Sequence, residues 1–343
     1  MKKTVNNTIK AKKNVKDKKV VSKADEKVLE NNQKKQLSVA IIGICKNADE
    51  KAFADIRSEF QKLYLDEKKV SIIDFGNIEF DEGEVKKVIC DAETKNIHLV
   101  FLCENAEIST DVLSLRITKE LSIVLVLADV TQENKHIAKL LDAEKSELAA
   151  IAYQNYFSDK NIIDTLNKKH CTTIRLSEYR NDNNAIEPVL RDSNFLAIDL
   201  AAVRYSDGGT EKSPNGLYAE ELCQIANCAG LSNTISQVNI VCEQHESIVT
   251  DKLAAQTIWH FVDGLANRIV ETPSKNKLKK FIVNMENSQV NLVFYKSNIT
   301  NRWWIEVSNK NKTKMIACTF ADYQRAFNND IPARWIKEMQ KMS

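Results

Sequence analysis

The chain has 343 residues, of which 43% are hydrophobic and 28% charged, with only 8 Gly and 4 Pro. This length suffices to bury a sizeable core as one large α/β domain or two smaller ones. No apolar run approaches the ~18–20 residues of a membrane-spanning helix, and the N-terminus has lysines without the apolar segment of a signal peptide. The sequence therefore predicts neither an integral membrane protein nor a secreted one.

The net charge of +2 conceals an asymmetry between the N-terminal segment and the remainder. Residues 1–36 hold 12 Lys against 4 acidic residues, a net +8, which leaves −6 for the rest of the chain. The segment has no aromatic residues and few apolar ones, so we expect a disordered tail that packs on nothing. Its charge suits binding to nucleic acid, ribosomes or an acidic partner, but without Arg or aromatics a solubilising extension is the favoured interpretation.

Order is expected to begin at Leu37, where apolar runs of strand length start to alternate with segments of helical periodicity. The predicted strands are 37–42, 70–75, 97–103, 122–127, 148–152, 172–176, 195–200 and 237–242. Helical spacing of Phe53, Ile56 and Phe60 marks the first intervening helix. Continuously apolar strands that alternate with helices predict a parallel sheet covered on both faces, with ligands at the carboxyl ends of its strands.

Two later helices have clearer boundaries. One is predicted from Tyr218 to Ala229, with Gly230 as its left-handed stop. The other is predicted to start after Thr250 as N-cap, with Pro273 behind it. We expect residues 37–270 to form one α/β domain.

The pattern changes after residue 277, where short aromatic and β-branched runs alternate with Asn/Ser turns. The runs 279–285, 290–296, 302–307 and 314–318 predict an antiparallel meander. Thr319 is expected to cap a short helix, and Pro332 to open a last one. Residues 278–343 are therefore predicted to form a small β-plus-helix appendix.

The tryptophans and cysteines are expected to be core residues. Trp303, Trp304 and Trp335 cluster in the appendix, where burial is favoured over a stacking surface. The eight cysteines, at 45, 90, 103, 171, 223, 228, 242 and 318, include no CxxC pair and most lie in apolar stretches. Buried thiols of this kind indicate a reducing compartment, so we expect a cytoplasmic protein.

Several segments carry a resemblance. Among them are Ile186-Glu-Pro-Val-Leu-Arg-Asp192, Phe195-Leu-Ala-Ile-Asp199, Pro214-Asn-Gly-Leu-Tyr-Ala-Glu-Glu221, Ile151-Ala-Tyr-Gln-Asn-Tyr156, Arg302-Trp-Trp-Ile-Glu306 and Ile331-Pro-Ala-Arg-Trp335. Together they resemble the arginase/ureohydrolase family, in particular a formimidoylglutamase-like bacterial branch, over residues 150–335. The resemblance implies a three-layer α/β/α sheet, which agrees with the periodicity, and a homo-oligomer.

The family's chemistry implies two Mn²⁺ ions held by carboxylates and His, with a bridging hydroxide that attacks a guanidinium or imidate carbon. Its Gly-Gly-x-His motif corresponds here to Cys103-Glu104-Asn105-Ala106. Its Asp-Ala-His-x-Asp motif corresponds to Leu127-Ala128-Asp129-Val130-Thr131, and its Ser-x-Asp-x-Asp motif to Ala197-Ile198-Asp199-Leu200-Ala201. Most ligand positions have thus changed, and no pair among the five His has a ligand spacing such as HxxxH.

Three residues remain as candidates for a site. Asp199 matches a metal ligand of the family motif, and Asp129 falls where a His ligand would stand. For Asp199 we favour a relic carboxylate that hydrogen-bonds a loop over a metal ligand, because its partner ligands are absent. Glu221 ends a Gly-Leu-x-x-x-Glu pattern whose Glu, by the resemblance, faces the cationic end of a substrate. The alternative is that Glu221 complements the positive end of a helix dipole.

The leading hypothesis is a family homologue without dinuclear metal catalysis, which acts as a binding or assembly protein and needs no cofactor. The first alternative is a Mn²⁺-dependent hydrolase of guanidino or formimino substrates, that is, of linear amidines, with a rearranged site. The second is a scaffold whose Lys-rich tail binds nucleic acid or ribosomes. We predict a strand-end pocket that Ala106, Leu127 and Ala201 make apolar, with Asp199 and Asp129 bonded by loops or by Arg204.

Overall fold

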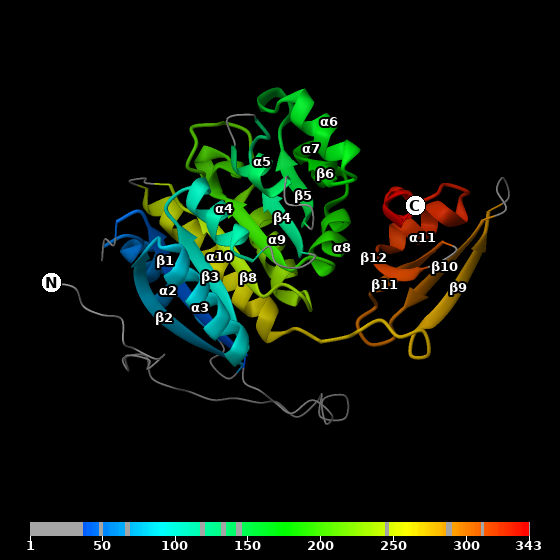
Figure 1. Cartoon of the computed structure of the whole chain (residues 1–343), viewed down its shortest axis with the longest axis horizontal. Coiled ribbons are helices and arrows are strands. Elements are labelled where there is room, and N and C mark those ends of the chain that lie inside the picture. Colours follow the sequence, from blue (N-terminus) through cyan, green and yellow to red (C-terminus); the bar gives the residue numbers. More distant parts are fainter. Residues whose placement is uncertain are drawn as a thin grey trace.

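The computed structural model describes residues 37–47, 51–65, 69–116, 121–131, 135–141, 146–243, 247–285, 290–309 and 312–342. Its main element is an eight-stranded sheet with the strand order β2-β1-β3-β8-β7-β4-β5-β6 (Figure 1). The strands are β1 Leu37–Cys45, β2 Val70–Glu79, β3 Ile97–Cys103, β4 Leu121–Val126, β5 Ser146–Tyr153, β6 Thr172–Arg175, β7 Phe195–Asp199 and β8 Gln237–Val241. Every neighbouring pair is parallel, which confirms the predicted sheet.

Helices cover both faces of this sheet. They are α2 Ala54–Gln61, α3 Glu82–Lys95, α4 Ala106–Ser114, α5 Lys135–Leu141, α6 Lys160–Lys168, α7 Leu176–Asn181, α8 Ile186–Arg191, α9 Ala219–Leu231 and α10 Ile248–Ala266, with the 3₁₀ turns η1 Asn155–Phe157, η2 Asn183–Ala185, η3 Leu200–Ala202 and η4 Tyr205–Asp207. Val39 and Ile41 of β1 pack on the side of α9 and α10, whereas Ala40 and Ile42 pack on the side of α3 and α4. Burial on both faces explains why the strands read as unbroken apolar runs.

Two predicted helix boundaries are wrong. Gly230 lies inside α9 rather than behind it, and the helix ends at Leu231 with Ser232 as its extended C-cap. A Cβ at Gly230 would lie 2.2 Å from the carbonyl oxygen of Phe261 in α10. The glycine therefore permits close contact between two helices and supplies no left-handed turn. Thr250 is likewise buried inside α10, whose N-cap is Ser247.

Gly230→Ala is expected to destabilise the protein by about 1–3 kcal/mol, because the added methyl group must push α9 away from α10. Alanine is the better helix former, so intrinsic propensity opposes this loss. Gly83→Ala in α3 is the control, since a Cβ there meets only the Asp81 side chain, at 3.2 Å. Urea unfolding measures both free energies, and an unchanged midpoint for Gly230→Ala would show that the helices can separate without cost.

A second, four-stranded sheet follows the main one, and it is antiparallel in the order β12-β11-β10-β9. Its elements are β9 Lys279–Asn284, β10 Asn291–Lys296, β11 Trp303–Ser308, β12 Thr313–Cys318, α11 Phe320–Phe327 and α12 Ala333–Met342. The predicted meander is confirmed, as is the cap, because the Thr319 side chain accepts a hydrogen bond from the Asp322 N–H. Trp303 and Trp304 are buried and Trp335 packs against the same core, so these rings are core residues.

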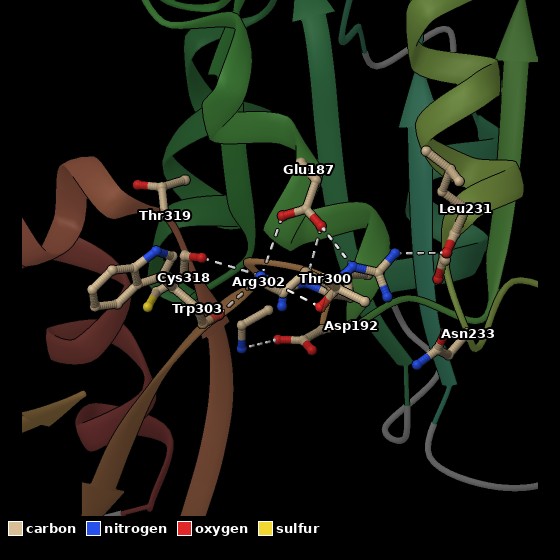
Figure 2. A network of polar contacts seen from close by, with 12 residues as sticks. Glu187, Asp192, Leu231, Asn233, Thr300, Arg302, Trp303, Cys318 and Thr319 are labelled. Carbon is tan, nitrogen blue, oxygen red and sulfur yellow. Dashed lines mark hydrogen bonds and ion pairs between the residues drawn. The ribbon is translucent and has the colours of Figure 1, made fainter. Parts of the chain in front are cut away.

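Two arginine side chains, one buried and one half-buried, join the two sheets (Figure 2). Arg191, at the end of α8, is 5% exposed, and its Nη2 donates to the carbonyl oxygens of Trp303 (3.0 Å) and Cys318 (3.1 Å). Its Nε lies 3.1 Å from a carboxylate oxygen of Glu187, which also lies 3.8 Å from the Nε of Arg302. The Glu187 carboxylate thus contacts Arg191 of the main α/β domain and Arg302 of the C-terminal unit, residues 278–343.

Other predictions have separate outcomes. All eight cysteines are free thiols, and six of them are buried, with Cys90 exposed and Cys228 half-buried. The predicted tail of residues 1–36 lies outside the described residues. Within the described ranges, the helices are too short or too polar to cross a bilayer.

Candidate functional site

Two of the three predicted site residues, Asp199 and Asp129, lie at the carboxyl edge of the main sheet, where β3, β4, β7 and β8 end. A pocket of about 70 Å³ opens there between α4 and the strand ends. Its lining is mostly apolar and includes Ala106, Leu127, Leu125 and Val241, with Asp199 as its one carboxylate. Ala106 and Leu127 therefore line the pocket as predicted, at two positions where the family resemblance implies metal-ligand motifs, whereas Ala201, the third residue predicted to line it, does not.

Asp199 is the last residue of β7, and it also caps the 3₁₀ turn that follows. Its Oδ1 accepts a hydrogen bond of 2.9 Å from the Ala201 N–H. Burial raises the pKa of Asp199 from 3.8 to about 7; the Ala201 N–H opposes this rise, and the negative charges of Glu243, Asp129 and Glu211 add to it. The structure thus gives Asp199 the loop donor that was predicted.

Arg204, the alternative donor that was predicted, has a different partner. Its Nε pairs with Asp207 Oδ1 at 2.7 Å rather than with either candidate carboxylate. Arg204 precedes the turn η4 and Asp207 is its last residue, so a local i,i+3 pair forms without the cost of burying the guanidinium at the strand ends. In the described part of the chain, Asp199 consequently forms no ion pair with a basic side chain.

Asp129 and Asp199 come together because β4 and β7 are adjacent parallel strands that end at the same edge. Glu104, another acidic residue at a strand end, has a different partner, since its Oε2 accepts a 2.7 Å hydrogen bond from the backbone N–H of Lys46. Glu107 is exposed in the first turn of α4. The edge therefore holds acidic residues with separate local roles.

Sequence reasoning missed Glu243 and Glu211. Glu243 stands two residues beyond β8, so the same strand-end rule that selected Asp129 also applies to it. Glu211 lies in the loop between η4 and α9, which has no strand-end signal. The set around Asp199 that the described residues form thus consists of carboxylates. His98, on β3, is buried, and burial followed by the charge of Arg268 lowers its pKa to about 4.

Glu221 lies in the first turn of α9, where it has two partners. Its Oε2 accepts a 2.7 Å hydrogen bond from the Tyr218 N–H, which makes it part of a capping arrangement. Its Oε1 lies 3.2 Å from the Nε of Arg180. The guanidinium carbons of Arg180 and Arg204 each lie 4.3 Å from the centre of the Tyr218 ring. Glu221 is therefore paired with a guanidinium of the chain itself.

These residues do not fit a pair of Mn²⁺ ions. Among the described residues, no group of three or more His, Cys, Asp or Glu side chains has the geometry to hold a metal ion. A dinuclear centre needs bridging carboxylates with ordered partners, whereas Ala106 and Leu127 present hydrocarbon to the pocket.

Structural comparison relates the fold to known enzymes, whereas no family model and no curated protein matches the sequence. Trypanosoma cruzi formiminoglutamase with Mn²⁺ aligns with a TM-score of 0.59 at 15% identity, over 71% of this chain and 97% of that one. Bacillus subtilis formimidoylglutamase aligns with a TM-score of 0.58 at 15% identity, over 70% of this chain and 90% of that one. The agmatine ureohydrolase of Thermoplasma volcanium aligns with a TM-score of 0.54 at 15% identity, over 67% of this chain and 90% of that one.

The architecture therefore defines an α/β protein with a three-layer sandwich around a parallel sheet. More specifically, the chain has the fold of the arginase superfamily, in the form seen in formiminoglutamases and agmatine ureohydrolase. This agrees with the resemblance found in the sequence.

Proposed function

We propose that this chain is a non-catalytic homologue of the arginase/ureohydrolase enzymes, which uses their fold as a binding or assembly protein in the cytoplasm. The observation that supports this most is the composition of the strand-end pocket. Ala106 and Leu127 line it, and its one carboxylate, Asp199, is bonded by a backbone N–H and has a pKa raised to about 7. An apolar lining with a single carboxylate offers few of the charged donors that a pair of Mn²⁺ ions needs.

The pairing of Glu221 also supports this proposal. In the family pattern its carboxylate faces the cationic end of a substrate, and here the Arg180 guanidinium lies against that carboxylate. Arg180 is further held by the carbonyl oxygen of Gly216 at 2.7 Å and by the Tyr218 ring. A guanidino substrate would have to displace this internal cation.

We expect the purified protein to retain well under one equivalent of Mn²⁺ after soaking and desalting. We also expect urea and formamide release at background rates on arginine, agmatine and formimidoylglutamate. The reason is that too few charged donors reach the pocket to offset the lost hydration of two divalent ions. Elemental analysis measures the bound Mn²⁺, and product assays on the same sample measure the released urea and formamide. Stoichiometric metal together with turnover on any substrate would contradict the proposal.

The alternative function is a Mn²⁺-dependent hydrolase of linear amidines with a rearranged site. The observation in its favour is that Glu243, Asp129 and Glu211 lie near enough to Asp199 to raise its pKa. Local rearrangement that drew these carboxylates together would supply negative charge for a cation. The metal and turnover measurements decide between the two functions.

A further inference from the structure

A second and larger cavity lies at the opposite edge of the main sheet, between that sheet and the C-terminal unit. It measures about 440 Å³, within the ~300–1,000 Å³ range of small-molecule sites. Its walls come from the starts of β4, β5 and β6, from the end of α8, and from β12, α11 and α12. We call it the interdomain cleft. It is distinct from the strand-end pocket, because parallel strands begin and end at opposite edges.

Among the described residues, cations predominate on the walls of the interdomain cleft. Six lining residues are basic: Arg191, Lys314, Arg325, Arg334, Lys337 and Lys341. Four are acidic: Glu147, Asp192, Asp322 and Glu338. Three of these acids each neutralise one cation, in the pairs Lys314–Glu338 (2.7 Å), Arg334–Asp322 (2.9 Å) and Lys341–Glu147 (3.0 Å). The fourth, Asp192, accepts a hydrogen bond from the Ala317 N–H at 2.8 Å.

Three cations of the described lining remain after this pairing, beside the carboxylate of Asp192. Lys337 donates to the carbonyl oxygen of Cys171 at 3.1 Å, and no carboxylate of the described chain forms an ion pair with it or with the exposed Arg325. Arg191 is paired with Glu187 outside the lining, yet its buried Nη1 has no hydrogen-bond partner among the described residues. Burial, then the charges of Lys341 and Arg334, lowers the pKa of Lys337.

These cations line one cavity from three helices. Arg334, Lys337 and Lys341 follow one another at i, i+3 and i+7 along α12, so they share the helix face that lines the cleft. Arg325 of α11 and Arg191 of α8 line the same space from other elements. Guanidinium groups bind phosphate oxygens with paired donors, and lysine adds a compact charge.

We propose that the interdomain cleft binds a small phosphate-bearing molecule through Lys337, Arg325 and Arg191. A cavity of this size admits a metabolite of low molecular weight and excludes folded protein or duplex nucleic acid. Ligand bound there contacts both units at once, since Arg191 belongs to the main domain and Lys337 to the C-terminal unit. The proposal rests on the cleft alone and is independent of whether the strand-end pocket is catalytic.

The test is isothermal titration of the full chain with pyrophosphate, orthophosphate and succinate in 150 mM NaCl, where surface charges are screened within ~8 Å. We expect saturable 1:1 binding of pyrophosphate, weaker binding of orthophosphate and none of succinate. Lys337→Met is expected to weaken pyrophosphate binding at least tenfold, and so is Arg325→Met, which alters an exposed side chain. Lys86→Met on α3 is the matched control, an exposed helical lysine away from the cleft, and should bind within twofold of wild type.

Circular dichroism melts of each variant establish that it is folded before the titration is interpreted. Absence of saturable pyrophosphate binding to the wild type would overturn the proposal. Equal affinity of Lys337→Met and wild type for pyrophosphate would overturn it too. An equal loss of affinity in Lys86→Met would show that the effect comes from general surface charge, and would also overturn the proposal. Tighter binding of succinate than of pyrophosphate would replace the phosphate class with a dicarboxylate and reject the proposal as stated.

Discussion

Arg191→Leu is expected to destabilise the protein by about 3–5 kcal/mol, the usual cost of removing one partner from a buried ion pair. The change removes the Glu187 ion pair and the hydrogen bonds to the carbonyl oxygens of Trp303 and Cys318. It also removes the guanidinium that lies 4.8 Å from the centre of the Trp304 ring. Because total stabilities are about 5–15 kcal/mol, this is a large fraction.

The four tryptophans make the effect measurable in each unit. Trp303, Trp304 and Trp335 lie in the C-terminal unit, and Trp259 lies in α10, so fluorescence reports mainly on the smaller sheet. Circular dichroism reports mainly on the helices of the main domain. We expect urea unfolding of Arg191→Leu to show the fluorescence transition at lower urea than the dichroism transition, because Arg191 holds the units together.

A surface ion pair provides the control. Arg175 pairs with Glu178 at 2.7 Å, but both side chains are more than 40% exposed, so Arg175→Leu should cost at most about 1 kcal/mol. Equal losses in the two variants would show that Arg191 contributes no more than an exposed arginine. Coincident fluorescence and dichroism transitions in Arg191→Leu would show that other contacts suffice to couple the units.

The fold could be predicted from the sequence because its signals are local and repeated. Unbroken apolar runs such as Ile97–Cys103 identify strands that are buried on both faces, and alternation with helices then leaves a parallel sheet as the consistent arrangement. The wrong helix boundary at Gly230 arose because a glycine can have either of two structural roles. Gly230 ends helices in many proteins, but here it allows α10 to approach α9, and a contact with Phe261 across 31 positions leaves no local trace.

The candidate site was predictable in position and only partly in composition. Strand ends located Asp129 and Asp199 because β4 and β7 are neighbours, and the same rule applied to β8 would have included Glu243. The pairing of Arg180 with Glu221 could not be foreseen, since the two residues lie 41 positions apart and on different helices. Side-chain partners that are set by packing are visible only in three dimensions.

Asp199→Asn is expected to stabilise the protein at pH 8, by up to about 4 kcal/mol, the equivalent of a pKa raised from 3.8 to about 7. Below pH 3.8 the carboxyl group is neutral in both the folded and the unfolded chain, so it contributes no penalty. As the pH rises toward 7 the unfolded chain ionises first, and the folded state loses relative stability over this range. Asparagine is neutral at every pH, and its Oδ1 can still accept the Ala201 N–H.

The pH profile therefore distinguishes this carboxyl group from an ordinary one. Asp207→Asn is the matched control, because burial is outweighed there by the Arg204 guanidinium, which lowers the pKa of Asp207. That variant should lose stability at pH 8 and approach wild type at acid pH, the reverse of Asp199→Asn. Unfolding free energies at pH 4, 6 and 8, with and without Mn²⁺, make the measurement. If Mn²⁺ stabilised the wild type and not Asp199→Asn, Asp199 would be a working ligand, because only a metal-bound carboxylate gains stability from the ion, and the alternative hydrolase function would be favoured.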